Sequence, residues 1–168
     1  MKGKVLLFHK TTEDEKQRIS DWREDGASAV YHLPPYAEQL RMHRGFANPK
    51  NNFYSFADGS KLIGYINLIE EETAVFFGIG LNPLYCNQGY GQRICKKALR
   101  LSHQLYPQKP VYLEVRTWNC RAVRCYEKAG FRIVGEPIIR TTPIGEGTFF
   151  HMEENGARTG GDAEDAPQ

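Results

Sequence analysis

Residues 78–99 read GIGLNPLYCNQGYGQRICKKAL, and residues 113–136 read LEVRTWNCRAVRCYEKAGFRIVGE. In the first stretch, an apolar strand runs into a glycine-rich turn that opens a basic helix. In the second stretch, a strand that carries Glu114 leads to a short helix with Tyr126 near its end. The first stretch is suited to a phosphate-bearing ligand, and the second offers an acid and a base. These two stretches decide the fold and the chemistry that we expect.

The turn at residues 88–91 stands between the predicted strand and the predicted helix. Glycines at Gly89 and Gly91 let the backbone approach a ligand closely, and the free N–H groups of a helix start attract phosphate. Positive charge continues along the helix at Arg93, Lys96, Lys97 and Arg100. The alternative is an ordinary turn with two incidental glycines.

Two common nucleotide-binding loops do not fit this turn. A Walker A loop needs G-K-[ST] after its glycines, and no such run follows Gly91. A Rossmann fingerprint needs G-x-G-x-x-G, whereas Gly91 is followed by Gln92, Arg93 and Ile94. The turn therefore belongs to neither class.

The first stretch resembles the GNAT acyl-CoA N-acyltransferases. That family carries [QR]-x-x-G-x-[GA] after a strand that ends in an apolar residue, a polar residue and Pro. Here Leu81-Asn82-Pro83 precedes the run from Cys86 to Gly91. Cys86 stands at the Gln/Arg position, a departure that affects one side-chain contact and leaves the backbone cradle.

The resemblance implies acetyl-CoA as co-substrate and assigns its binding residues. The pantetheine arm would pair with the end of the strand like an added strand, and a backbone N–H near Leu81 would stabilise the oxyanion. Asn119 would be the N-cap of the helix that follows the Glu114 strand, and its side chain would also contact the cofactor. The pantetheine residues would be Ile79, Gly80 and Leu81, and the pyrophosphate residues would be Asn87, Gln88, Gly89, Tyr90, Gly91 and Gln92.

The second stretch resembles the RimI-type protein N-terminal acetyltransferases. In that branch the Glu of L-E-V acts as the base and the Tyr of Y-E-x-x-G-F acts as the acid, which Glu114 and Tyr126 match in spacing. Tyr126 would also contact the cofactor, and a phenol with an ordinary pKa of about 10 stays protonated at neutral pH. The implied activity is direct attack by a primary amine on acetyl-CoA in a ternary complex.

Each catalytic role has an alternative in the sequence. Glu114 could lie on a solvated strand face and pair with Arg116 or a neighbouring lysine, in which case Glu71 or Glu72 could relay the proton through water. Tyr126 shares the apolar stripe of its helix and could belong to the core.

The acceptor is open between classes. The RimI-like run favours a peptide or protein N-terminus or a lysine, and a small amine such as an aminoglycoside or polyamine is the alternative. A GNAT-like fold that binds CoA as a sensor without turnover is a third reading. Residues 27–52 and the predicted loop at residues 139–148 would shape the acceptor side.

Composition describes a globular chain of 168 residues with 40% hydrophobic and 25% charged residues. A membrane span needs about 18 consecutive apolar residues, and no apolar run in the sequence is that long. The four cysteines include no C-x-x-C pair, which indicates reduced thiols in a cytoplasmic protein and no zinc site. Residues 153–168 carry five acids and one arginine, which leaves about +6 on residues 1–152. This charge suits a polyanionic ligand and is too weak for nucleic acid. A homodimer is left open.

The order of predicted elements indicates an α/β (α+β) chain. We expect strands at residues 5–9, 53–57, 61–69, 73–81, 110–116, 131–139 and 148–152, and helices at residues 12–24, 36–43, 88–103 and 119–129. Thr12 with Glu15 makes a capping-box pattern at the start of the first helix, and Gly130 stands in a C-cap position after the last. Together these would form the GNAT fold, a mixed, mostly antiparallel twisted sheet of about seven strands flanked by about four helices. One domain would cover residues 1–152, followed by an acidic, disordered tail at 153–168.

Overall fold

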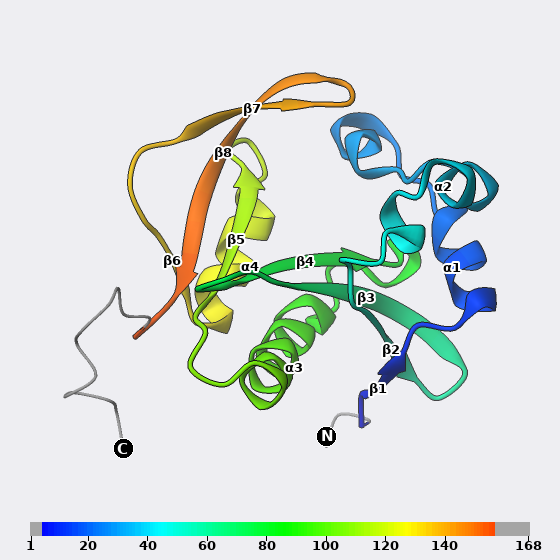
Figure 1. The fold of residues 1–168 in the computed structure, drawn as a ribbon, viewed down its shortest axis with the longest axis horizontal. Helices are drawn as coiled ribbons and strands as arrows, with labels where there is room; N and C mark the ends of the chain where they lie inside the picture. Colours follow the sequence, from blue (N-terminus) through cyan, green and yellow to red (C-terminus); the bar gives the residue numbers. More distant parts are fainter. Residues whose placement is uncertain (1–4, 157–168) are drawn as a thin grey trace. The chain divides into compact units, whose positions relative to one another are not determined.

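The computed structural model describes residues 5–156, and Figure 1 traces their helices and strands. The strands form an eight-stranded sheet in the order β1-β2-β3-β4-β5-β8-β6, with β7 paired to β8. Strands β4 and β5 run parallel, whereas the β1–β2, β2–β3, β5–β8, β6–β8 and β7–β8 pairs are antiparallel. The strands are β1 (Leu7–Lys10), β2 (Phe53–Asp58), β3 (Lys61–Glu70), β4 (Val75–Leu81), β5 (Val111–Arg116), β6 (Phe131–Ile133), β7 (Ile138–Thr142) and β8 (Gly145–Glu154).

Four α-helices and three 3₁₀ helices accompany the sheet in the described residues. The expected mixed, mostly antiparallel sheet flanked by about four helices is confirmed. The α-helices are α1 (Glu13–Ser20), α2 (Tyr36–Met42), α3 (Tyr90–Leu105) and α4 (Cys120–Ala129), and the 3₁₀ helices are η1 (Gly26–Tyr31), η2 (Gly45–Ala47) and η3 (Pro83–Tyr85).

The chain is organised in two compact units. One unit ends at Ile69 and resumes with Gly78–Ile94, and the other contains Glu70–Phe77 and the chain from Cys95 onward. Strand β4 and helix α3 each contribute residues to both units.

In the first unit, a capping box begins helix α1, and the buried side-chain amide of Gln39 forms hydrogen bonds to the neighbouring segments. Thr12 caps α1 with the predicted capping box, because its hydroxyl accepts from the Glu15 N–H and the Glu15 carboxylate accepts from the Thr12 N–H. Gln39, 1% exposed, donates to the Ser20 hydroxyl at 2.9 Å and accepts from the Phe46 N–H at 2.9 Å. These bonds tie α2 and η2, in the segment of residues 27–52, to the end of α1.

In the second unit, strand alternation separates two faces of β5. Val111, Leu113 and Val115 are buried in the core with Met152 and Phe131. The intervening side chains, Tyr112, Glu114 and Arg116, point to the other, partly exposed face, since successive residues of a strand alternate. Helix α4 follows β5 and packs on β6 (Figure 1).

Several expected boundaries change. Helix α1 ends at Ser20 rather than near Glu24. The single strand expected at residues 131–139 is two strands, β6 and β7, because Gly135 adopts a left-handed φ of 76° and Pro137 has no N–H to donate. The loop expected at residues 139–148 is wrong: β7 and β8 form a hairpin there, registered from Ile138 opposite Phe149 to Thr142 opposite Gly145.

Strand β8 also continues beyond Met152, where we expected it to end. Glu153 pairs with Tyr112, and the Glu154 carboxylate accepts from the Val111 N–H at 3.0 Å. The first two residues assigned to the acidic tail therefore belong to the sheet. Residues 155 and 156 follow in a turn, and residues 157–168, the remainder of the predicted tail, lie outside the described part of the chain.

Candidate active site

The end of β4 is anchored to β3 by the side chain and backbone of Asn82. Its N–H donates to the Ile63 carbonyl at 2.8 Å, its side-chain amide donates to the Leu62 carbonyl at 3.0 Å, and its side-chain oxygen accepts from the Leu84 N–H at 3.1 Å. This anchor sets the start of the turn that leads into α3. Asn82, read in the sequence only as the polar residue of the motif, is thus a structural determinant of the site.

The turn before α3 contains two left-handed residues. Asn87 has φ 64° and Gly89 has φ 82°, and both are exposed. A Cβ built on Gly89 would meet no atom within 4 Å, so the space over its backbone is open. Left-handed residues next to a helix start curl the backbone into a concavity of N–H groups that can bind an anion.

The charge around this turn favours an anion. The first turn of α3 contains no acidic residue, and Arg93 lies over the Tyr90 ring at 5.5 Å from its centroid. The Tyr90 hydroxyl donates to Asp58 at 2.8 Å, and this hydrogen bond raises the pKa of Tyr90. The Tyr90 side chain is therefore engaged with the β2–β3 turn, and its backbone is the part available to a ligand. An exposed, glycine-bearing helix start with basic residues fits a pyrophosphate.

The strand residues predicted to bind pantetheine lie at the end of β4. Val75 and Phe77 are buried, whereas all four residues from Gly78 to Leu81 are partly exposed. Gly80 is required by packing, because a Cβ there would lie 2.3 Å from the Tyr65 ring. Ile79 and Leu81 thus present apolar side chains and strand backbone at a partly open position.

The predicted acid lies on α4, whose two ends form as the sequence indicates. The Asn119 side chain accepts from the Ala122 N–H at 3.2 Å, and Gly130 ends the helix with a left-handed φ of 110°. Tyr126 is partly buried, with its ring edge-on to Phe131 at 6.3 Å between centroids. It is therefore not enclosed in the core like Val123 and Ala129.

The predicted base, Glu114, forms an ion pair with Arg140 of β7. Arg140 Nε donates to Glu114 Oε1 at 2.8 Å and to Oε2 at 3.4 Å, and its Nη2 lies 2.8 Å from Oε1. The partner of Glu114 is thus Arg140 and not Arg116, which the sequence offered as an alternative partner; the Arg116 guanidinium lies over the Phe149 ring at 4.9 Å. Glu114 is partly buried and stands opposite His151 of β8.

The alternative base, Glu71, contacts the same face of the sheet. Its carboxylate accepts from the Tyr112 hydroxyl at 2.7 Å, and the Tyr112 ring stacks on His151 at 5.1 Å. Burial, and then the hydrogen bond to Glu71, raises the pKa of Tyr112 well above its ordinary value. Glu72 is exposed beside Glu71.

Sequence reasoning missed Arg140, Tyr112 and His151 as members of this face. Tyr112 could have been found, since it is two residues before Glu114 on one strand and must share its face. The positions of Arg140 and His151 on this face depend on the registers of β7 and β8, which cannot be read from the local sequence pattern.

Within residues 5–156, no group of three or more His, Cys, Asp or Glu side chains could hold a metal ion. In the same range, no helix is long and apolar enough to cross a membrane.

Comparison with known proteins gives one family. Residues 16–131 match the sequence model of the Acetyltransferase (GNAT) family. The N-alpha-acetyltransferase RimI of Mycobacterium tuberculosis (strain ATCC 25618 / H37Rv) is 32% identical over 107 residues, which are 61% of this chain and 63% of the relative. The match therefore spans less than two thirds of that protein.

Solved structures agree on the fold. A spermidine N-acetyltransferase from Vibrio cholerae, in complex with CoA and spermine, has a TM-score of 0.67 at 20% identity, over 88% of this chain and 94% of that one. AAC(6')-Ib in complex with Parmomycin and AcetylCoA has a TM-score of 0.69 at 20% identity, over 94% and 99% of the two chains. With the family match covering more than half of its residues, this chain belongs to the GNAT acetyltransferase family.

Proposed function

We propose that this protein transfers the acetyl group of acetyl-CoA to a primary amine, with a peptide or protein N-terminus or a lysine as the acceptor. The turn with left-handed Asn87 and Gly89 at the basic start of α3, placed where the family's motif lies, is the observation that carries the proposal. The relationship to a protein named as an N-alpha-acetyltransferase supports the peptide acceptor.

The turn residues have the role of holding the cofactor's phosphates. Backbone N–H groups from Asn87 to Gln92 bind the pyrophosphate, because a helix start and a concave backbone favour an anion. Ile79, Gly80 and Leu81 bind the pantetheine arm along the end of β4, and Asn119 adds a contact from the start of α4. The Leu81 N–H is the donor proposed for the oxyanion.

Two protons must move during the reaction. Bound acetyl-CoA supplies a thioester carbonyl that the amine attacks, and the carbon–sulfur bond then breaks to release a thiolate. Tyr126 donates its phenol proton to that thiolate, since a partly buried tyrosine on a fixed helix can hold an O–H toward a sulfur acceptor. Glu114 accepts the proton of the attacking ammonium on Oε2, since Arg140 holds Oε1 at 2.8 Å and approaches Oε2 only to 3.4 Å.

Glu71 is the second candidate for the base. It is exposed at the turn before β4 and holds the Tyr112 hydroxyl on the face that carries Glu114. A water between Glu71 and the ammonium would carry the proton without any change in the Glu114–Arg140 pair. The response of Glu114→Gln distinguishes the two carboxylates.

A small amine is the alternative acceptor. Two of the structurally similar proteins are in complex with amines, spermine in one and Parmomycin in the other. Thiol release from acetyl-CoA should therefore be measured with peptides with a free N-terminus, peptides with a blocked N-terminus and one lysine, spermidine, and an aminoglycoside. Turnover with the first two peptides and little with the small amines is expected. The reverse order would overturn the acceptor, and no turnover with any amine would favour a CoA sensor.

A further inference from the structure

Two arginine side chains lie on the face of β5, β8 and β7 that carries Glu114. Arg116 is opposite Phe149 in the register of β5 and β8, and Arg140 is opposite Gly147 in the register of β7 and β8. Register partners share a face, and so do residues two apart on one strand, so both arginines belong to the face of Glu114. The positive charge of this face is therefore concentrated beside the β7–β8 hairpin.

Gly147 leaves the space that the Arg116 guanidinium occupies. A Cβ on Gly147 would lie 2.5 Å from Arg116 Nη1 and 3.3 Å from Arg116 Cζ. The same guanidinium lies over the Phe149 ring, 4.9 Å from its centroid. The Arg116 charge is therefore held over the strand position that faces Arg140.

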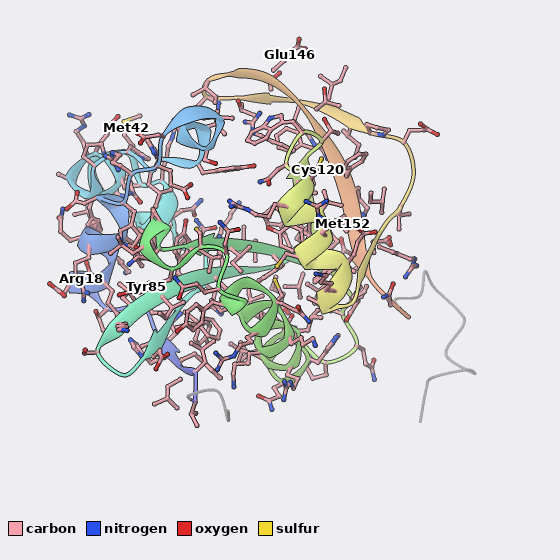
Figure 2. The ribbon with its side chains drawn as sticks, turned by 180° about the vertical axis from the view of Figure 1, so that it is seen from behind. Arg18, Met42, Tyr85, Cys120, Glu146 and Met152 are labelled. Atoms are coloured by element: carbon pink, nitrogen blue, oxygen red, sulfur yellow. The ribbon has the colours of Figure 1, made fainter. Side chains whose placement is uncertain are left out.

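The charge of the two guanidiniums is only partly neutralised. Glu114 is the partner of Arg140, whereas Arg116 makes no ion pair within residues 5–156. Glu146 precedes Gly147 in the chain, so it alternates to the other face, and its side chain projects outward from the hairpin (Figure 2). Arg116 is partly buried, and a partly desolvated cation without a counter-ion favours an anionic ligand.

Both arginines have N–H groups left for such a ligand. Arg140 contacts Glu114 through Nε and Nη2, so the two N–H groups of its Nη1 are not used by that pair. The contact of Arg116 with the Phe149 ring involves its charge and no acceptor oxygen, so its donors keep their capacity for a carboxylate. Guanidinium N–H groups match the two oxygens of a carboxylate in geometry.

The other end of the same face is acidic. Tyr112, two residues before Glu114, donates its hydroxyl hydrogen bond to Glu71, and Glu153 is opposite Tyr112 in the register. Along β5 the face therefore passes from carboxylates near Tyr112, through Glu114, to the guanidinium of Arg116. This order of charges is complementary to a molecule with an ammonium at one end and a carboxylate at the other.

We propose that Arg116 and Arg140 bind a carboxylate of the acceptor, so that the protein prefers peptides whose second residue is aspartate or glutamate. The inference rests on the proposed function, because it places the reacting N-terminal amine at Glu114 Oε2. Arg140 keeps its contact with Oε1, and the acidic side chain of the second residue extends to the two guanidiniums. The arginines thereby position the amine, and a lysine at the second residue is repelled.

The test compares acetyl transfer to three peptides that differ only in their second residue, which is glutamate, glutamine or lysine. For the parent, kcat/KM should be roughly 10- to 100-fold higher with glutamate than with glutamine, the scale of hydrogen bonds to charged groups. It should be lowest with lysine. The difference should lie mainly in KM and should shrink as salt is added, because the contact is remote from the reacting carbon and partly exposed. Equal kcat/KM for glutamate and glutamine overturns the proposal.

Three variants assign the preference to the arginines. Arg116→Gln leaves the Glu114–Arg140 pair in place and should lower kcat/KM for the glutamate peptide to near that for the glutamine peptide. Gly147→Ala keeps both charges, but its Cβ displaces the Arg116 guanidinium, so the preference should fall as well. Arg124→Gln removes a cation from an exposed position of α4 and is the matched control, which should keep the parental preference. A parental preference in Arg116→Gln overturns the proposal, and this variant decides it if Gly147→Ala does not fold.

A binding measurement separates this inference from the proposed function. Calorimetric titration in the presence of CoA should show tighter binding of the glutamate peptide than of the glutamine peptide, and Arg116→Gln should abolish the difference. This result supports the arginine pair even if no amine is acetylated, an outcome that would overturn the proposed function alone. Equal affinities overturn the arginine pair while turnover still supports acetyl transfer. Free glutamate acetylated faster than the glutamate peptide would overturn the peptide as the source of the carboxylate.

Discussion

Arg140 of β7 holds the Glu114 carboxylate of β5 with two nitrogens, Nε at 2.8 Å and Nη2 at 2.8 Å from Oε1. The carboxylate proposed to accept a proton is therefore already occupied by a cation from the β7–β8 hairpin, whose tip carries Glu146 (Figure 2). The pair joins the proposed chemistry to a part of the chain beyond the segment that matches the family model. Its strength and its effect on catalysis can be measured separately.

The strength of this pair should be modest. Side-chain exposure is 56% for Arg140 and 16% for Glu114, so solvent screens the interaction. We expect a coupling free energy of about 0.5–1 kcal/mol between Glu114→Gln and Arg140→Gln in a double-mutant cycle of urea unfolding. A coupling near zero would show that the pair does not persist in solution.

Replacement of the proposed base should change the pH dependence of turnover. A carboxylate accepts a proton only when ionised, so the parent should lose activity at acidic pH. Glu114→Gln cannot titrate, and the acidic limb of kcat should flatten with the same acceptor. Arg140→Gln keeps the carboxylate and should keep that limb. A parent-like limb in Glu114→Gln would transfer the base role to Glu71, Glu72 or water.

Removal of the proposed acid should affect turnover and leave cofactor binding unchanged. Tyr126→Phe keeps the ring that packs against Phe131 and removes the only proton it could donate. We expect kcat to fall about 10²- to 10⁴-fold, with little change in acetyl-CoA affinity. Tyr54→Phe on β2 is the matched control and should keep parental turnover. Unchanged kcat in Tyr126→Phe, where chemistry limits the rate, would leave water as the acid.

The proposed phosphate turn can be tested against an equivalent glycine elsewhere. Gly89 and Gly135 have φ of 82° and 76°, and a Cβ at either would meet nothing within 4 Å. Gly89→Ala and Gly135→Ala should therefore each cost about 1–2 kcal/mol of backbone strain. Only Gly89→Ala should also reduce the rise in melting temperature that acetyl-CoA produces by linkage. An equal rise in both variants would contradict the assigned site.

A bulkier change at the neighbouring glycine extends this test. Gly91 lies in the first turn of α3 and is buried, so Gly91→Val should block the approach of the backbone to the pyrophosphate. The melting temperature of this variant should not respond to acetyl-CoA. Binding as tight as in the parent would show that the pyrophosphate lies elsewhere.

Sequence alone was sufficient where the controlling interactions are local. The Thr12–Glu15 capping box, the Asn119 cap and the left-handed Gly130 all link residues within a few positions of one another, so their spacing in the chain nearly determines their geometry. The same holds for the turn of Asn87 and Gly89 between β4 and α3. Those elements were predicted correctly, and with them the family.

Only the tertiary structure decided which distant side chains meet. The Arg140–Glu114 pair depends on the registers of β7 and β5 against β8, and a shift of one residue would turn Arg140 to the opposite face. The chain sequence determined the local elements because their hydrogen bonds close over three or four residues. The partner of the proposed base was decided by strand pairing between segments 26 residues apart in the chain, which no local pattern records.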